Sequence, residues 1–331
     1  MRIENSTPYK VFALPCYGPG GKPVLTVIVK GTFEMPPEGL AQTAKEQMPV
    51  LFADELYQKE GGSVKFESDL AAFKPRADVI LIGKAHTPGG RMVQVLDASL
   101  KVGSLRKILR VFGDREWDCS SRLVPDTFTA PQPFREMDLI YERAYGGMDG
   151  GEWCRENPVG RGFIAQSSKK VADKTPLPNV EDPAQLIRSW KDRPRPAGFG
   201  FYGRVWMPRA GFLGTYDGKW RETRSPAPPD DFRFDFCNAA HPELQVPGYL
   251  RGDEDVELVN LSPEGALRFR LPSVTPAVAI ARFDSETREA PAMNLDTLCL
   301  IPGEKKFFQI WRGVSPVHDL SGTEVKTVEV R

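Results

Sequence analysis

Hydrophobic residues alternate with polar ones, or cluster in short runs, at the N-terminal end of the chain, and this pattern predicts β-strands. Residues 23–35 (PVLTVIVKGTFEM) are rich in β-branched side chains and long enough for one strand. Residues 78–86 and 106–117 alternate in the same way, and TPGG at 87–90 is typical of a tight turn. Short strands joined by tight turns indicate antiparallel pairing, because parallel strands need long crossovers.

The last 80 residues repeat this pattern. Residues 255–272 (DVELVNL, SPEG, ALRFRLP) predict a hairpin, residues 277–284 and 293–301 predict a second one, and residues 305–313 predict a final strand. The expected fold class is therefore mainly β, or β-rich α+β. We expect antiparallel sheets or a sandwich formed from both chain ends.

The middle of the chain has a different composition. Residues 120–250 hold 15 of the 30 prolines, 13 of the 30 glycines and four of the six tryptophans. Only residues 181–192 (EDPAQLIRSWKD) look helical, with Asp182 as N-cap and Pro183 at the first helical position. Loops this long are uncommon unless they are functional, so we expect ordered loops rich in Pro, Gly, Trp and Arg that pack over the β scaffold.

The length of 331 residues fits one large unit or two ordinary domains. We predict a single unit over 1–331. Possible sub-lobes are a β-rich part at 1–119, a loop-rich part with one short helix at 120–250, and a β-rich part at 251–331.

Charge and cysteine content narrow the class of protein. The 44 basic residues balance 44 acidic ones, whereas nucleic-acid binding usually needs a basic excess, so no nucleic-acid partner is expected. No apolar run reaches 18 residues, and the N-terminal run Val11–Leu14 is too short for a signal peptide. Five scattered cysteines without a C-x-x-C pair are typical of reduced thiols. These features predict a cytoplasmic protein with no membrane partner.

One short motif resembles a phosphate-binding loop. Residues 198–203 (GFGFYG) match G-x-G-x-x-G, which needs a strand before it and a helix starting within it. Pro194 and Pro196 interrupt such a strand, and Pro208 would interrupt the helix. We therefore predict that these glycines form turns and that the neighbouring aromatic residues pack, with no nucleotide bound.

Other cofactor and catalytic motifs are equally weak. The histidines His86, His241 and His318 are far apart in sequence and have no second ligand at metal-binding spacing, so neither a metal nor another cofactor is expected. There is no G-x-S-x-G nucleophile elbow. Cys154 lies beside Arg155, which could lower a thiol pKa, but a structural cysteine is the simpler interpretation. No catalytic residue is predicted.

Arginine and aromatic residues are concentrated in the middle region. Residues 135–233 contain 12 of the 26 arginines together with four tryptophans. Trp, Tyr and Arg are enriched at protein–protein hot spots, although Arg–Trp stacking also holds loops together internally. The candidate interface or loop-organising residues are Arg204, Trp206, Arg209, Trp220 and Asp231.

A series of blocks resembles a known bacterial family. In chain order the blocks are FKPRADVILIGKAH, VFGDREW, MDLIYERAYGG, ENPVGRGF, LPNVEDP, RPAGFGFYGRVWMPR, LGTYDGKW, PPDDFRFDFCNAAHPELQ, LRGDEDVELVNLSPEG and LDTLCLIPG…WRG. The resemblance extends from about residue 5 to residue 313, and the quoted blocks lie between residues 73 and 313. Together they resemble a family of unknown function whose genes accompany the VgrG spike, PAAR-tip and effector genes of type VI secretion clusters. Cys237 departs from the family pattern, which more often has an aromatic residue there.

The resemblance implies a cytoplasmic, non-enzymatic adaptor or chaperone. Its expected partners are a type VI effector, a PAAR protein or both, and VgrG is a further candidate partner. The alternative is an enzyme or binding module for carbohydrate or peptidoglycan, with an aromatic-lined cleft. Scattered carboxylates such as Glu142, Glu156 or Asp217 would then do the chemistry.

Overall fold

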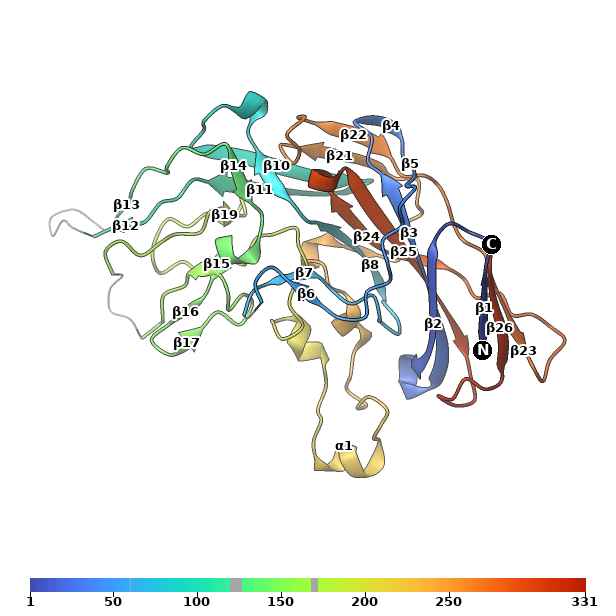
Figure 1. Ribbon diagram of the computed structural model, residues 1–331. Helices are drawn as coiled ribbons and strands as arrows, with labels where there is room; N and C mark the ends of the chain where they lie inside the picture. Colours follow the sequence, from blue (N-terminus) through green and yellow to red (C-terminus); the bar gives the residue numbers. More distant parts are fainter. Residues whose placement is uncertain (60, 120–126, 168–171) are drawn as a thin grey trace.

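The computed structural model describes residues 1–59, 61–119, 127–167 and 172–331, and its regular secondary structure is almost entirely β-strand, joined by long loops (Figure 1). At its centre is a mixed sheet of seven strands. In spatial order they are β2 (Lys10–Tyr17), β3 (Pro23–Glu34), β25 (Lys306–Pro316), β24 (Asn294–Ile301), β8 (Arg76–Leu81) and β20 (Gln245–Pro247), and β5 (Gln42–Thr43) pairs with the end of β3. The two chain ends therefore share one sheet, as the β-rich ends predict.

A second and a third sheet pack near this one. The six-stranded sheet has the order β19 (Val180–Glu181), β11 (Leu105–Phe112), β10 (Val95–Val102), β21 (Asp255–Val259), β22 (Leu267–Arg270) and β4 (Glu38–Leu40). The three-stranded sheet has the order β1 (Arg2–Asn5), β26 (Val325–Val330) and β23 (Val278–Arg282). One hydrophobic core contains residues of all three sheets.

Strand β3 shows why the core lies here. Ten consecutive residues, 24–33, are buried, and such a continuous buried run suits a strand that is covered on both faces. The rings of Phe33 and Phe307 stack with centroids 5.3 Å apart, and Phe307 lies 5.6 Å from Phe269 of β22. These three rings join the seven-stranded sheet to the six-stranded one.

One expectation about strand pairing is wrong. Residues 277–284 and 293–301 do not form a hairpin, because β23 pairs with β26 and β24 pairs with β25. Pairing is also not purely antiparallel: β24–β8, β1–β26 and β22–β4 are parallel. These parallel partners are far apart in sequence, so the long connections that they need are available.

The remaining strands form five two-stranded pairs. They are β6 (Glu55–Leu56) with β7 (Val64–Phe66), β9 (Lys84–His86) with β14 (Glu136–Asp138), β12 (Trp117–Asp118) with β13 (Thr127–Phe128), β15 (Tyr145–Gly146) with β18 (Arg161–Gly162), and β16 (Met148–Asp149) with β17 (Glu152–Trp153). Short 3₁₀ turns complete the chain: η1 (Pro19–Gly21), η2 (Pro88–Gly90), η3 (Tyr141–Arg143), η4 (Arg209–Phe212), η5 (Phe234–Cys237), η6 (Pro242–Leu244) and η7 (Pro302–Glu304).

The helix expected at residues 181–192 is absent. Carboxylates bind the backbone of this segment and hold it in turns: Ile187 N–H donates to the buried Glu181 carboxylate, and Ser189 N–H donates to Asp192, both at 2.8 Å. Such side-chain acceptors compete with helical hydrogen bonds. Within the described residues, the α-helix of this region is α1 (Gly218–Thr223) instead.

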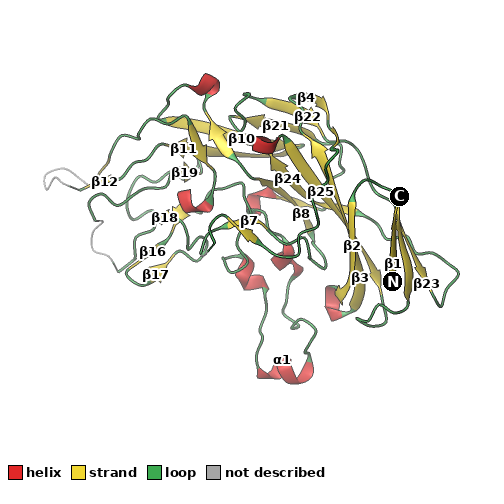
Figure 2. Cartoon of the chain, in the orientation of Figure 1, coloured by secondary structure: helices red, strands yellow, loops and turns green. Residues whose placement is uncertain are grey.

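Helix α1 lies at the tip of an arm that extends away from the sheets (Figures 1 and 2). We call residues 213–232 the arm. Its two sides meet at the base between η4 and η5, where Arg233 N–H donates to the Phe212 carbonyl at 2.9 Å. The arm contributes no residue to the hydrophobic core clusters of the described chain. It is therefore a local unit on the β scaffold.

Candidate protein-binding site

The arm is held together by its own polar contacts. The Asp217 carboxylate accepts from Trp220 N–H at 2.8 Å and caps α1. Across the arm, Trp220 Nε1–H donates to the Ala227 carbonyl at 2.9 Å. The Asp231 carboxylate accepts from Thr215 N–H at 2.9 Å and from Thr215 Oγ1–H at 2.7 Å, and these bonds lower the pKa of Asp231. Side-chain bonds thus fix the arm in one shape.

A buried ion pair fixes the base of the arm. Arg209 on η4 donates to both carboxylate oxygens of Glu67, with distances of 2.6 Å from Nη1 and 2.5 Å from Nη2. It also donates to the carbonyls of Tyr202 and Phe236, each at 2.7 Å. The half-exposed Arg204 side chain lies beside this pair and contacts Asp54 at 3.0 and 3.1 Å and Glu67 at 2.9 Å.

Three aromatic rings form a cluster beside this ion pair. Trp206, Tyr141 and Tyr202 lie at mutual centroid distances of 5.2 to 5.4 Å, in edge-to-face arrangements. A Cβ atom at Gly198 would lie 2.8 Å from the Tyr141 ring, and one at Gly203 would lie 2.7 Å from the Trp206 ring. Neither glycine has a positive φ. The motif at 198–203 therefore needs glycine for close ring contact at Gly198 and Gly203. The expected turn is present at Gly203, where Trp206 N–H donates to the Gly203 carbonyl at 3.1 Å.

A pocket of about 260 Å³ lies next to the aromatic cluster. Its apolar lining consists of Pro196, Tyr202, Met207, Pro208 and Pro242. Its polar lining consists of Glu156, Arg195 and His241.

His241 is a structural part of the pocket wall. Its Nδ1 accepts from Glu243 N–H at 3.2 Å, so Nε2 carries the proton and donates to the Pro196 carbonyl at 3.0 Å. Burial lowers the pKa of His241 to about 4, and the nearby positive charge of Lys107 acts in the same direction. The ring is neutral at pH 7 with both nitrogens in use.

Exposed apolar side chains surround the arm and its base. Val205 is 81% exposed, and Met207, Leu213 and Tyr216 are also exposed. Met207 N–H donates to the Arg155 carbonyl at 2.8 Å, which fixes the backbone beside the pocket. Apolar side chains on a fixed backbone are suited to contact with another protein.

The structure divides the five candidate residues between two places. Arg204, Trp206 and Arg209 meet at the base of the arm, where Trp206 and Arg209 are buried and organise the loops. Trp220 and Asp231 lie within the arm and hold its two sides together.

The sequence did not identify Glu67 or His241 as parts of this site. Glu67 is 142 residues from Arg209, and no local pattern marks it as a partner. His241 follows the prolines and turns of a loop, and its spacing gives no sign of the pocket.

The carboxylates named for a glycosidase-like site have separate roles. Glu142 accepts from Ser63 N–H and Oγ–H, each at 2.7 Å, Asp217 caps α1, and Glu156 lines the pocket. Burial raises the pKa of the Cys154 thiol, in contrast to an activated nucleophile. Within the described ranges, no group of three or more metal-binding side chains is found.

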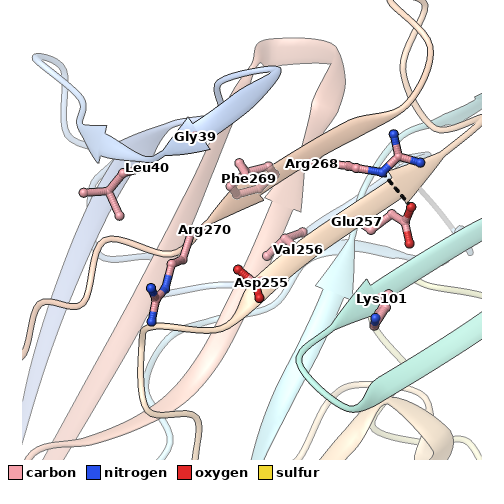
Figure 3. Close-up of a pocket in the computed structure, with 9 residues that line it drawn as sticks. All are labelled: Gly39, Leu40, Lys101, Asp255, Val256, Glu257, Arg268, Phe269 and Arg270. Carbon is pink, nitrogen blue, oxygen red and sulfur yellow. Dashed lines mark hydrogen bonds and ion pairs between the residues drawn. The ribbon is translucent and has the colours of Figure 1, made fainter.

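A shallower groove lies on the outer face of the six-stranded sheet (Figure 3). Its volume is about 640 Å³, and it is crossed by charged side chains of neighbouring strands. Glu257 accepts from Arg268 at 2.9 Å, and Arg270 turns toward Asp253, with contacts at 2.9 and 3.3 Å. Because several of these charges neutralise each other, this face is well suited to water.

Comparison with known proteins identifies a family. A family model described as an uncharacterized protein conserved in bacteria matches residues 20–312. No curated protein and no solved structure matches the chain. In the part of the chain that is described, no helix is long and apolar enough to cross a membrane.

Proposed function

We propose that this chain, which belongs to the bacterial family DUF2169, is a non-enzymatic adaptor that binds another protein through its arm and the base of the arm. The proposed client is a type VI secretion effector, through its N-terminal or PAAR-linked region, and the adaptor assists loading onto the VgrG spike in the cytoplasm. The type VI assignment rests on the ten sequence blocks that resemble the family found in those gene clusters.

One structural observation supports protein binding. The arm extends from the scaffold with a fixed shape and exposes Leu213 and Tyr216, while Val205 and Met207 are exposed at its base. A pre-organised surface loses little conformational entropy on binding, so its apolar contacts contribute more fully to affinity. This arrangement suits an adaptor that covers apolar surface on a client before assembly.

Co-expression with the effector encoded beside its gene tests the proposal. We expect the effector to be soluble and secreted with the wild-type chain, and to lose both properties when Leu213 and Tyr216 are changed to Ala together. The matched control is Lys101→Ala, an exposed residue of the groove in Figure 3. If the effector is equally soluble and equally secreted without this chain, the adaptor proposal fails.

A further inference from the structure

The pocket beside the aromatic cluster has two charged side chains, Glu156 and Arg195, that form no direct ion pair with the described residues. Among the described residues, the Glu156 carboxylate contacts only the Cys154 thiol, at 3.9 Å, and it has no cationic partner. The exposed Arg195 guanidinium forms no hydrogen bond or ion pair with the described residues, and its charge contributes to the lowered pKa of the nearby Glu243 carboxyl. Most other cations around the arm are paired, as Arg204 and Arg209 are.

The rest of the pocket wall is apolar and fixed. Tyr202 is held in the aromatic cluster, and three prolines restrict the backbone around the opening. Met207 is the adaptable part of the wall, because its side chain is flexible and 37% exposed. A volume of about 260 Å³ is below the 300–1,000 Å³ of pockets for drug-sized ligands, and it is large enough for one big side chain.

From these features we propose that the pocket takes one large apolar side chain from an extended segment of a partner protein. Glu156 accepts a backbone N–H of that segment, and Arg195 donates to a backbone carbonyl. The occupant is a peptide because a carboxylate and a guanidinium beside an apolar pocket match the donor and acceptor that flank every side chain in an extended chain.

This inference deepens the proposed function, on which it rests for the identity of the partner. It adds that the client presents an extended segment with Leu, Met or an aromatic residue at the contact. The proposed binding mode needs no chemistry at the site, because it uses only hydrogen bonds and apolar burial.

Methionine-methyl NMR tests the inference directly. The chain has eight methionines, so 13C-methyl labelling gives a simple spectrum in which Met207→Leu assigns the Met207 signal. The probes are blocked tripeptides, N-acetyl-Gly-X-Gly-amide, with X as Leu, Met, Phe or Ser. We expect the Met207 signal to shift saturably, with dissociation constants of about 1 mM for the apolar peptides. Binding of the Ser peptide should be at least about tenfold weaker, because its side chain buries little apolar area.

Matched variants test the two charges. Arg195→Ala should weaken binding of the Leu peptide about tenfold or more, by the usual strength of a hydrogen bond to a charged group, whereas Glu156→Gln keeps an acceptor oxygen and should weaken it about fivefold through the lost charge. Glu222→Gln and Arg188→Ala are the controls, since both positions are exposed and neither side chain forms a hydrogen bond or ion pair with the described residues. Unchanged thermal unfolding of the four variants confirms that each is folded.

In the peptide experiment, three outcomes would overturn the inference. They are the absence of a saturable Met207 shift with every peptide, equal binding of the Ser and Leu peptides, and binding of free leucine as tight as that of the blocked Leu peptide. The last would indicate an amino-acid site. If a variant that no longer binds the peptides still keeps the effector soluble and secreted, the pocket is also rejected as the binding site of the client. The adaptor proposal would remain intact. If the chain binds the peptides but does not keep the effector soluble and secreted, the adaptor proposal is rejected instead.

Discussion

Arg209 and Glu67 lie 142 residues apart in the chain and form a buried ion pair with two hydrogen bonds. Their side chains are 4% and 7% exposed. Arg209 belongs to η4 at the base of the arm, and Glu67 directly follows β7. The pair therefore joins the arm to a part of the scaffold that the sequence places far away.

Breaking this pair from one side should destabilise the whole protein. Arg209→Met leaves the Glu67 carboxylate with only the half-exposed Arg204 as a partner, and removing one member of a buried pair costs about 3–5 kcal/mol. We expect a loss of that size in the free energy of unfolding, measured by urea denaturation. Arg221→Met, at an exposed position in α1, should change it by less than about 0.5 kcal/mol.

The double variant Arg209→Met with Glu67→Met distinguishes a lost ion pair from lost packing. It should recover part of the stability, because no uncompensated charge stays buried. The two single substitutions, Arg209→Met and Glu67→Met, each lower the free energy of unfolding. If these two losses simply add in the double variant, the electrostatic explanation is contradicted.

A second prediction concerns Gln309, a fully buried residue of β25. Neither the amide nitrogen nor the amide oxygen of its side chain has a hydrogen-bond partner among the described residues. Burying an unsatisfied polar group costs about 1–3 kcal/mol, so Gln309→Met should raise the free energy of unfolding or leave it unchanged.

Gln47 is the matched control for this substitution. Its amide accepts from Thr32 N–H at 2.8 Å and donates to the carbonyls of Thr32 and Ala44 at 2.9 and 2.7 Å. Gln47→Met should therefore lower the free energy of unfolding in the same urea experiment. Destabilisation by Gln309→Met as large as that by Gln47→Met would show that the Gln309 amide is satisfied in solution.

The strands could be predicted because their signal is local. Residues 23–35 and 255–272 alternate or cluster in ways that only a strand satisfies, and the structure has strands β3, β21 and β22 there. Partner choice is not local: β24 follows β23 in the chain but pairs with β25 and β8. The helix expected at 181–192 is missing for a similarly non-local reason. The Glu181 carboxylate binds the backbone of this segment and also pairs with Arg115, which lies in the connection between β11 and β12.

Part of the candidate site was also predictable, because part of its signal is local in the sequence. Arg204, Trp206 and Arg209 lie close in sequence, so their grouping was visible in the chain, and the structure keeps them together. The pocket is assembled from segments around residues 156, 196, 207 and 242. No composition or spacing rule connects those segments, because turns and buried contacts bring them together.

A third prediction concerns the pH dependence of stability. The pKa of His241 in the folded chain is about 4, below its ordinary value of 6.5. Below pH 6.5 the unfolded chain therefore binds a proton that the folded chain does not bind. The contribution of the neutral, buried His241 to the free energy of unfolding is complete above pH 6.5 and is lost as the pH falls toward 4.

Urea denaturation between pH 7 and pH 5 measures this effect. One proton corresponds to a slope of up to about 1.4 kcal/mol per pH unit, and His241→Gln should remove most of it. His86 is the control: burial also lowers its pKa, but it is only partly buried, so His86→Gln should retain most of the slope. An unchanged slope in the His241 variant would contradict the assignment.

The last prediction is that the arm opens locally, independently of the β scaffold. It contributes no residue to the hydrophobic core clusters of the described chain, and its shape depends on a few bonds such as those between Asp231 and Thr215. Segments with few buried contacts exchange their amide hydrogens through local opening. Amides of residues 213–232 should therefore exchange faster than those of β3 and β25 in hydrogen-exchange mass spectrometry.

Asp231→Asn tests which bonds control that opening. The substitution removes the charge that strengthens both bonds to Thr215, so exchange in the arm should rise several-fold while β3 and the thermal midpoint stay unchanged. Asp230→Asn is the matched control, because the adjacent Asp230 carboxylate is highly exposed and, within the described part of the chain, forms an ion pair only with Arg224, at 3.3 Å. If the Asp231 variant lowered the thermal midpoint or accelerated exchange in β3, the arm would be part of the global folding unit.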